Sequence, residues 1–319
     1  MSLLQMSFSG AVFITAVVII RSAAINQLPK KTFLILWELV ILRLLIPISI
    51  PSVFSVYTLV IRNLSATALL GAESVYNIST AKEQFAVTRS MEQSPADIAS
   101  SISVWCIVWC TGMMLFALFF AISYLRCLTE FRTALPAHNH DVEKWLEERP
   151  LKRAICVKQS DRISAPLTYG IFHPVILMPK KMDWQNGKQL HYVLSHEFAH
   201  IYHYDTVKKL IATLALCIHW FNPFVWVMYT LFNRDIELAC DESVVRQFGE
   251  KSKSAYSLML ISMEAAKSGL LPFCNNFSKN AIEERITAVM KIKKTSLLAI
   301  CIAAILIVGV TTTFATSAA

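Results

Sequence analysis

The sequence predicts an integral membrane protein that is mainly α-helical and includes a small α+β part. Of its 319 residues, 55% are hydrophobic and only 16% are charged, which is unlike the composition of soluble proteins. Several apolar runs reach the length of about 20 residues that a helix needs to cross a bilayer. A polar stretch between the third and the fourth run leaves room for a folded domain.

Three predicted membrane helices lie in residues 1–125. They cover residues 3–20, 32–50 and 102–125, and each is about as long as a bilayer core is thick. The 53–101 loop has no excess of basic residues, so we place it outside the cell together with the N-terminus.

Residues 126–295 form the predicted domain on the inner side of the membrane. We expect a surface helix at 141–149 and a strand at 154–159. The prolines at 166–179 predict a turn followed by an apolar strand. That strand either binds an extended peptide along an exposed edge or is buried within a sheet.

The motif His196-Glu197-x-x-His200 lies on a predicted helix over residues 189–205. Positions i and i+4 share one face of a helix, so the two imidazoles can bind one zinc ion. Glu197 then lies beside the ion, where its carboxylate can take a proton from a zinc-bound water. This is the chemistry of peptide hydrolysis.

A third ligand is predicted at Glu237, because Glu237 and Asp241 share one face of a helix. Glu237 can bind zinc while Asp241 accepts the outward N–H of a ligating histidine. The alternative interpretation of this pair is a solvated acidic face. Two histidines, one glutamate and an open water position are typical of a catalytic zinc site. We interpret the neighbouring Cys240 as a small buried residue and not as a ligand.

Residues 210–232 are apolar and long enough to cross a membrane, but His219, Asn222 and Pro223 interrupt the middle of the run. A full crossing would separate Glu237 from the two histidines. The sequence therefore predicts a re-entrant or interfacial hairpin that turns near Asn222-Pro223.

The C-terminal part is predicted to contain helices at 255–267 and 281–293, joined by an exposed linker at 268–279. Residues 296–319 form the fourth membrane helix and a short tail outside the cell. The net charge of +8 arises largely from basic residues at the inner ends of apolar runs. We attribute this charge to membrane orientation and not to nucleic-acid binding.

The chain closely resembles the membrane zinc metallopeptidases of the BlaR/MecR type, which are beta-lactam-sensing antirepressors. The resemblance covers nearly the whole chain and rests on Leu28-Pro29 and on residues 170–179, 196–205, 219–226 and 237–241. The known receptors have a penicillin-binding sensor domain after the last membrane helix. We expect this chain, which ends at Ala319, to lack it. Either the sensor has been removed, or the trigger comes from a partner or from the 53–101 loop.

This resemblance implies a cytoplasmic gluzincin-like protease domain among four transmembrane helices of a bacterial plasma membrane. His196, His200 and Glu237 would bind one zinc ion, and Glu197 would be the general base. An external signal would activate self-cleavage, followed by loss of a cytoplasmic repressor and expression of antibiotic-resistance genes. The expected partners are membrane lipid, the repressor, a sensor protein and a second copy of the chain, with no direct binding of nucleic acid.

Two further details of the chemistry are the site of self-cleavage and the donor to the oxyanion. Self-cleavage is predicted between Asn276 and Phe277, because this class of protease favours a bulky apolar residue after the scissile bond. The oxyanion that forms during hydrolysis needs a donor. The candidate donors are Tyr169, His173, His219 and Arg234.

Two other functions fit parts of the sequence. One is a housekeeping membrane zinc protease that removes damaged proteins, and the other is a catalytically silent scaffold that relays a signal. The stretches at 170–179 and 222–223 favour the regulatory protease over the housekeeping one. Glu197 argues against the scaffold, because a non-catalytic zinc site has no use for that carboxylate.

Overall fold

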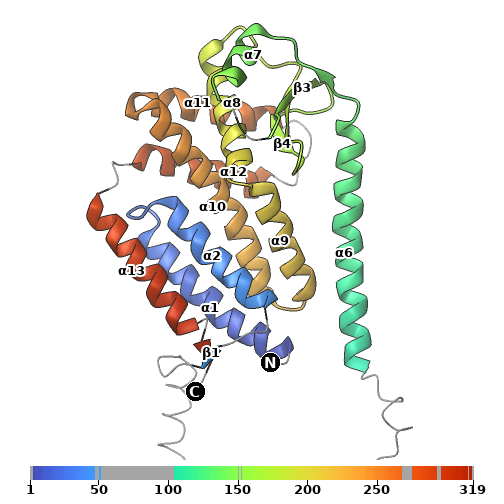
Figure 1. Cartoon of the computed structure of the whole chain (residues 1–319), viewed down its shortest axis with the longest axis vertical. Coiled ribbons are helices and arrows are strands. Elements are labelled where there is room, and N and C mark those ends of the chain that lie inside the picture. Colours follow the sequence, from blue (N-terminus) through green and yellow to red (C-terminus); the bar gives the residue numbers. More distant parts are fainter. Residues whose placement is uncertain are drawn as a thin grey trace, which may run out of the picture.

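The structure is a computed structural model. It describes residues 3–46, 50–51, 104–149, 151, 153–267, 275–292, 296–314 and 316–317. The predicted 53–101 loop and residues 268–274 of the predicted linker lie outside the described residues. Figure 1 shows a helical bundle at one end, a small sheet with short helices at the other, and the long helix α6 along one side.

The bundle buries a core of large apolar side chains, among them Phe13, Trp37 and Phe232, all at most 2% exposed. These side chains come from helices that are apolar on the faces they turn toward each other, so burial removes that surface from water or lipid. The helices are α1 (Leu3–Ala24), α2 (Lys30–Leu45), α9 (Asp205–Ile218), α10 (Pro223–Phe248) and α13 (Leu297–Phe314).

Two helices among the described residues are long and apolar enough to cross a membrane, namely α1 and α6 (Val104–Phe131). Helix α2 has 16 residues and ends at Leu45, well before the predicted end at residue 50. Pro47 explains this end, because a proline disfavours helical geometry in the residue before it. Helix α13 has 18 residues, and its described apolar part covers Leu297–Val310. Crossings beyond α1 and α6 therefore stay a prediction.

Helix α6 contacts the bundle at the turn between α9 and α10. The indole of Trp220 lies against Gly112 of α6, where a Cβ atom would come within 2.3 Å of the ring. The Trp220 Nε1–H donates to the carbonyl of Trp109 at 3.3 Å, and the Trp109 Nε1–H donates to that of Ile218 at 2.9 Å. A larger residue at position 112 would therefore push α6 away from the bundle.

The chain reverses at residues 219–222, which is where the sequence places the turn. Asn222 begins α10 by accepting the backbone N–H of Phe224 at 2.9 Å, and Pro223 fits the first helical position because it has no N–H to satisfy. The Asn222 side-chain amide also donates to the Ser7 hydroxyl at 2.8 Å, which fixes the turn against α1. How deeply this hairpin enters a membrane stays a prediction.

The sheet has four strands in the order β2-β3-β5-β4. The central strand β5 is parallel to β3 and antiparallel to β4. Gly170, at φ +89°, makes the turn from β4 into β5, and a side chain there would meet the His173 carbonyl. The strands are β2 (Leu135–Pro136), β3 (Cys156–Ser160), β4 (Leu167–Tyr169) and β5 (Val175–Pro179). Two other short strands, β1 (Ile50–Pro51) and β6 (Thr316–Ser317), form a separate parallel pair.

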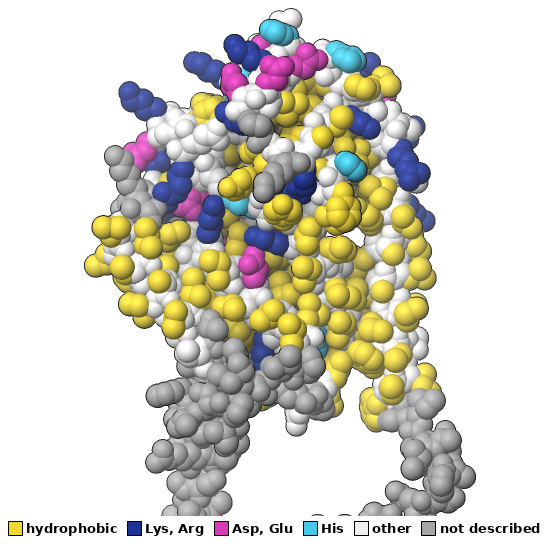
Figure 2. Space-filling view, in the orientation of Figure 1, with side chains coloured by type: hydrophobic (Ala, Val, Ile, Leu, Met, Phe, Trp, Pro, Cys, Tyr) yellow, Lys and Arg dark blue, Asp and Glu magenta, His cyan; other side chains and the backbone are white. Residues whose placement is uncertain are grey.

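A second core lies between the sheet and the remaining helices, and Ile176, Val193 and Tyr256 are fully buried in it. Helix α10 joins both cores, because Phe232 belongs to the first and Val244 to the second. The helices here are α7 (His140–Glu147), α8 (Gly187–Tyr202), the short 3-10 turn η2 (Glu250–Ser252), α11 (Lys253–Lys267) and α12 (Asn275–Lys291). Figure 2 shows charged side chains gathered at this end and hydrophobic ones over the bundle.

Helix α12 corrects one prediction from the sequence. The exposed linker was expected to extend to residue 279, but α12 already begins at Asn275. Asn275–Lys279 contains no glycine or proline, so nothing in this segment prevents the helix from starting early. Asn276 and Phe277 therefore lie in the first turn of a helix and not in a loop.

Candidate metal centre

Helix α8 places His196 and His200 on one face. The helix begins at Asn186, whose side chain accepts the N–H of Gln189 at 3.2 Å. Its apolar residues, such as Val193, pack into the second core and turn the histidine face toward α10. The two Nε2 atoms lie 3.3 Å apart.

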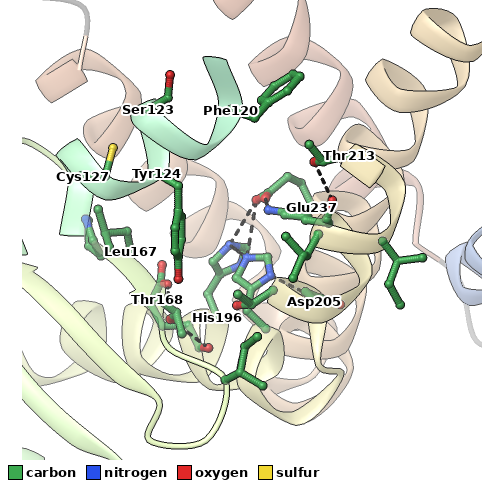
Figure 3. A pocket seen from close by; sticks show the side chains of 18 of the residues that line it. Phe120, Ser123, Tyr124, Cys127, Leu167, Thr168, His196, Asp205, Thr213 and Glu237 are labelled. Atoms are coloured by element: carbon green, nitrogen blue, oxygen red, sulfur yellow. Dashed lines mark hydrogen bonds and ion pairs between the residues drawn. The ribbon is translucent and has the colours of Figure 1, made fainter. Parts of the chain in front are cut away.

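Glu237 of α10 completes a three-residue group with the two histidines (Figure 3). Its Oε2 atom lies 3.5 Å from the Nε2 of His196 and 3.7 Å from the Nε2 of His200. Ligands bound tetrahedrally to zinc at about 2.1 Å lie about 3.4 Å from one another. The three donor atoms therefore have the spacing and the chemistry that a zinc ion requires.

Carboxylates hold the outward nitrogen of each ring. Asp205 accepts the Nδ1–H of His200 at 2.8 Å. The Nδ1 of His196 lies 2.9 Å from the Tyr256 hydroxyl and 3.3 Å from Asp241, and that hydroxyl donates to Asp241 at 2.6 Å. Such partners fix the ring orientation and leave each Nε2 free to bind a metal.

Asp241 thus lies where the sequence placed it, but Asp205 and Tyr256 were not predicted as partners of the histidines. Asp205 follows the zinc motif by only five residues, and this spacing could have indicated it. Tyr256 comes from α11, and we see no local pattern in the sequence that connects it with the motif.

The charges of the site are strongly coupled. Burial lowers the pKa of His196, but hydrogen bonds with Asp241 and Glu237 outweigh this effect and raise it. Burial also lowers the pKa of His200, whereas the neighbouring Cys240 and Glu237 raise it well above its ordinary value. Burial raises the pKa of Asp241, but Arg285 outweighs it and holds this pKa at about 2. The site therefore attracts cations, including protons.

Cys240 is fully buried, as predicted, and lies 3.3 Å from the Nδ1 of His200. Burial raises the pKa of its thiol to about 12, so the sulfur stays protonated. It lies 3.4 Å from Asp205, to which the S–H donates. The sulfur is on the side of His200 that faces away from Glu237, so it supports Asp205 and does not join the three-residue group.

Glu197 is 4% exposed and lies in the same cavity as the two histidines. Its Oε2 accepts a hydrogen bond from the Thr168 hydroxyl at 2.7 Å. Thr168 belongs to β4, which is one of the two edge strands of the sheet. The hydroxyl therefore orients the Glu197 carboxylate from the strand next to the proposed metal site.

The sheet decides between the two alternatives for the apolar strand within residues 166–179 and confirms the buried one. Strand β5, the apolar strand of that stretch, is central and buried along its whole length, so it cannot offer an edge to a peptide. The edge strand on this side of β5 is β4, which the sequence showed only as part of a turn. Because β4 has just three residues, its pattern is too short to indicate a strand.

The cavity at this site has a volume of about 1210 Å³. One side is formed by α6, from which Tyr124 extends toward Thr168 and His196 (Figure 3). Leu210 and Leu214 of α9 and Ile282 of α12 add apolar surface, so the cavity runs from the histidines down between α6 and α9. Its shape and lining suit an apolar polypeptide segment.

Comparison with known proteins identifies the family of the chain. The sequence model of the BlaR1 peptidase M56 family matches residues 1–289. The chain belongs to this family. A metallopeptidase-type family implies a metal, and the residues that could hold it here are His196, His200 and Glu237.

Named relatives in the family are similar over part of their length. The regulatory protein BlaR1 of Staphylococcus aureus is 24% identical over 293 residues, which cover 87% of this chain and 50% of that protein. BlaR1 of Bacillus licheniformis is 26% identical over 155 residues, covering 47% of this chain and 26% of the relative. The methicillin resistance mecR1 protein of S. aureus strain Mu50 is 25% identical over 118 residues, covering 37% and 20%. The chain thus matches half or less of each relative's length.

Four residues of this M56 chain were candidates for the oxyanion donor, and none of the four lines the cavity. His219 is buried at the hairpin turn, where its Nε2 lies 3.0 Å from the Leu44 carbonyl. Arg234 lies 3.6 Å from Glu284, and Tyr169 packs against a phenylalanine of α6. His173 is exposed in the loop before β5. The sequence offered these four residues as candidates without a way to decide where each side chain points.

Arg285 of α12 lies in the cavity instead. Its guanidinium donates to both oxygens of Asp241, at 2.7 and 2.8 Å, and lies 3.5 Å from Glu237. One of its nitrogens is 3.4 Å from the Nε2 of His196. Arg285 is 89 residues from His196 in the sequence, and its position in an ordinary helical stretch gave no signal.

Proposed function

We propose that the chain is an integral-membrane zinc endopeptidase of the regulatory type. The observation that carries this proposal is the grouping of His196, His200 and Glu237 around one point, with Glu197 in the same cavity. Membership of the M56 family supports the same conclusion independently. The three grouped residues would bind one zinc ion, and Glu197 would be the general base.

When bound, zinc lowers the pKa of a coordinated water and polarises a peptide carbonyl. In our proposal, Glu197 holds the proton of that water on its free carboxylate oxygen and passes it to the leaving amide nitrogen. Thr168 fixes the other carboxylate oxygen at 2.7 Å. The guanidinium of Arg285 provides positive charge in the cavity and is our candidate for stabilising the oxyanion.

The edge of β4 supports a mode of substrate binding. An extended peptide that pairs with Leu167–Tyr169 would pass the proposed metal site, because Thr168 bonds directly to Glu197. The apolar side chains of Leu210, Leu214 and Ile282 would contact bulky residues next to the scissile bond. An apolar binding surface of this kind agrees with the predicted self-cleavage site, where Phe277 follows the scissile bond.

The names of the relatives support a role in regulation and antibiotic resistance. They are a regulatory protein and a methicillin resistance protein. We propose that a signal from outside activates cleavage of this chain and of a cytoplasmic repressor, which derepresses resistance genes. The proposed topology has four membrane helices, both termini outside and the zinc site inside. A sensor partner and a second copy of the chain remain proposed partners.

Self-cleavage between Asn276 and Phe277 requires a structural change, because both residues lie in the first turn of α12. A protease binds its substrate extended, so this turn has to unwind before the bond can reach the metal. Unwinding of a first helical turn is a local event that costs less than opening a buried helix.

The test uses the full chain in detergent, with zinc content and fragment masses as readouts. We expect one zinc per chain and a fragment beginning near Phe277 in the wild type. Glu197→Ala should keep the zinc but yield no fragment, because the carboxylate binds no metal. If Glu197→Ala is cut in the same way, an outside protease is responsible. A wild type that binds no zinc would overturn the proposal.

A further inference from the structure

Helix α10 has acidic residues on two opposite faces. Glu237 and Asp241 face α8 and the proposed metal site. Asp235 and Glu242 are seven residues apart, which brings them to nearly the same angle on a helix, and they face α1 and α2. Asp235 is about 200° from Glu237 around the helix axis. One helix thus holds the proposed metal ligand on one side and contacts the first two helices on the other.

Arg21, at the end of α1, binds Asp235. Its Nε donates to the two carboxylate oxygens at 2.8 and 3.0 Å. Trp37 of α2 donates its indole N–H to the same carboxylate at 2.7 Å. Asp235 is 1% exposed and the Arg21 side chain 11%, so this ion pair is shielded from water. Loss of one partner from a shielded pair leaves an unpaired charge, which is strongly destabilising.

The same guanidinium also binds α12. Arg21 Nη2 donates to Glu284 at 2.6 Å. Glu284 directly precedes Arg285, which holds both oxygens of Asp241 and lies 3.5 Å from Glu237. Arg21 is therefore bonded to two helices, and each of them places a charged side chain at the proposed metal site.

A second contact strengthens the link between α10 and the turn from α1 to α2. The backbone N–H of Lys30, the first residue of α2, donates to Glu242 at 2.8 Å. Glu242 is 8% exposed. Contacts at Asp235 and Glu242 lie on either side of Glu237 along the helix, so they fix both the rotation and the height of this segment of α10.

We propose that Arg21 is a positioning residue of the metal site, through which helix α1 controls the placement of Glu237 and Arg285. The inference rests on the proposed function, because it takes the grouped residues to bind zinc. Arg21 itself lies outside the cavity and contacts no proposed ligand. Movement of α1 would pull on Asp235 and Glu284 together and so change the geometry of the site from a membrane helix.

The experiment measures zinc affinity by competition with a chelator and the visible spectrum of the cobalt-substituted protein, using the full chain in detergent. Arg21→Ala should weaken zinc binding by about 10- to 100-fold, the usual effect of losing a residue that orients a ligand. It should also change the cobalt spectrum, which reports ligand geometry. Arg21→Lys, which keeps the charge but not the two-sided contact, should give an intermediate loss.

Glu38→Gln is the matched control. It removes the 2.9 Å ion pair between Glu38 of α2 and Lys208 of α9, which also joins a bundle helix to the site region but does not involve α10 or α12. Zinc affinity and the cobalt spectrum should stay those of the wild type. A general loosening of the bundle would instead change both variants alike and overturn the specific role of Arg21.

Glu284→Gln covers the case in which Arg21→Ala does not fold. Glu284 is 26% exposed, and glutamine keeps its size, so the variant removes one charge with little effect on packing. We expect a loss of about tenfold in zinc affinity. Wild-type affinity and an unchanged spectrum in a folded Arg21 or Glu284 variant would overturn the inference and leave the proposed function intact. Absence of zinc from the wild type would overturn the proposed function first.

Discussion

Replacement of Thr168 by valine tests whether the edge strand orients the general base. Valine keeps the volume and the β-branched shape, so β4 should be retained, but it removes the hydroxyl that lies 2.7 Å from Glu197. A hydrogen bond to a charged group contributes about 1.5–3 kcal/mol. If the bond is needed in the transition state, its loss lowers the rate roughly 10- to 150-fold.

The assay follows release of the fragment beginning near Phe277 by mass spectrometry, with zinc content measured on the same sample. Zinc should stay at one per chain, because Thr168 contacts none of the proposed ligands. Thr213→Val is the control: Thr213 lines the same cavity, but its hydroxyl donates to the Lys209 carbonyl at 2.8 Å. Its rate should stay within about twofold of the wild type. Equal rates for the two variants would refute the role of β4 in orienting Glu197.

Three further predictions concern the metal ligands. Asp205→Asn removes the carboxylate that accepts the hydrogen bond of His200 at 2.8 Å. It should weaken zinc binding about 10- to 100-fold in a competition with a chelator. An unchanged zinc affinity would contradict a role of Asp205 in orienting His200. The pKa values of His196 and His200 are raised, so zinc must displace protons from these rings. The zinc affinity should therefore fall as the pH decreases from about 8 to about 6. A flat pH profile would show that these rings are not ligands. Burial raises the pKa of the Cys240 thiol to about 12, so alkylation of this thiol should be slow until the chain unfolds. The Cys240→Ala variant should still bind one zinc ion. Loss of the metal in this variant would show that the sulfur is a ligand.

The local parts of the fold could be predicted from the sequence. The helix of the proposed zinc ligands follows from the spacing of His196 and His200, and the helix around Glu237 follows from its spacing to Asp241. The turn at 219–222 followed from a polar interruption in an apolar run, with Asn222 and Pro223 suited to begin a helix. Each of these patterns involves residues within one or two turns of each other.

The parts that were missed depend on contacts between distant segments. Arg285 and Tyr256 reach the site from α12 and α11, and their position is set by how those helices pack. Strand order depends on pairing, so the buried β5 and the edge strand β4 could not be told apart. Local reasoning also failed at Asn275, where the absence of a breaker let α12 begin early.

The length of α10 has a consequence for control of the site. It is one helix from Pro223, at the turn that contacts α6, to Phe248 in the other core, and Glu237 lies near its middle. From Pro223 to Glu237 the helix rises about 21 Å, so a tilt of about 5° around the turn displaces the carboxylate by about 2 Å. That displacement equals the length of a zinc–oxygen bond. A tilt of only a few degrees around this turn is therefore large enough to assemble or dismantle the proposed metal centre.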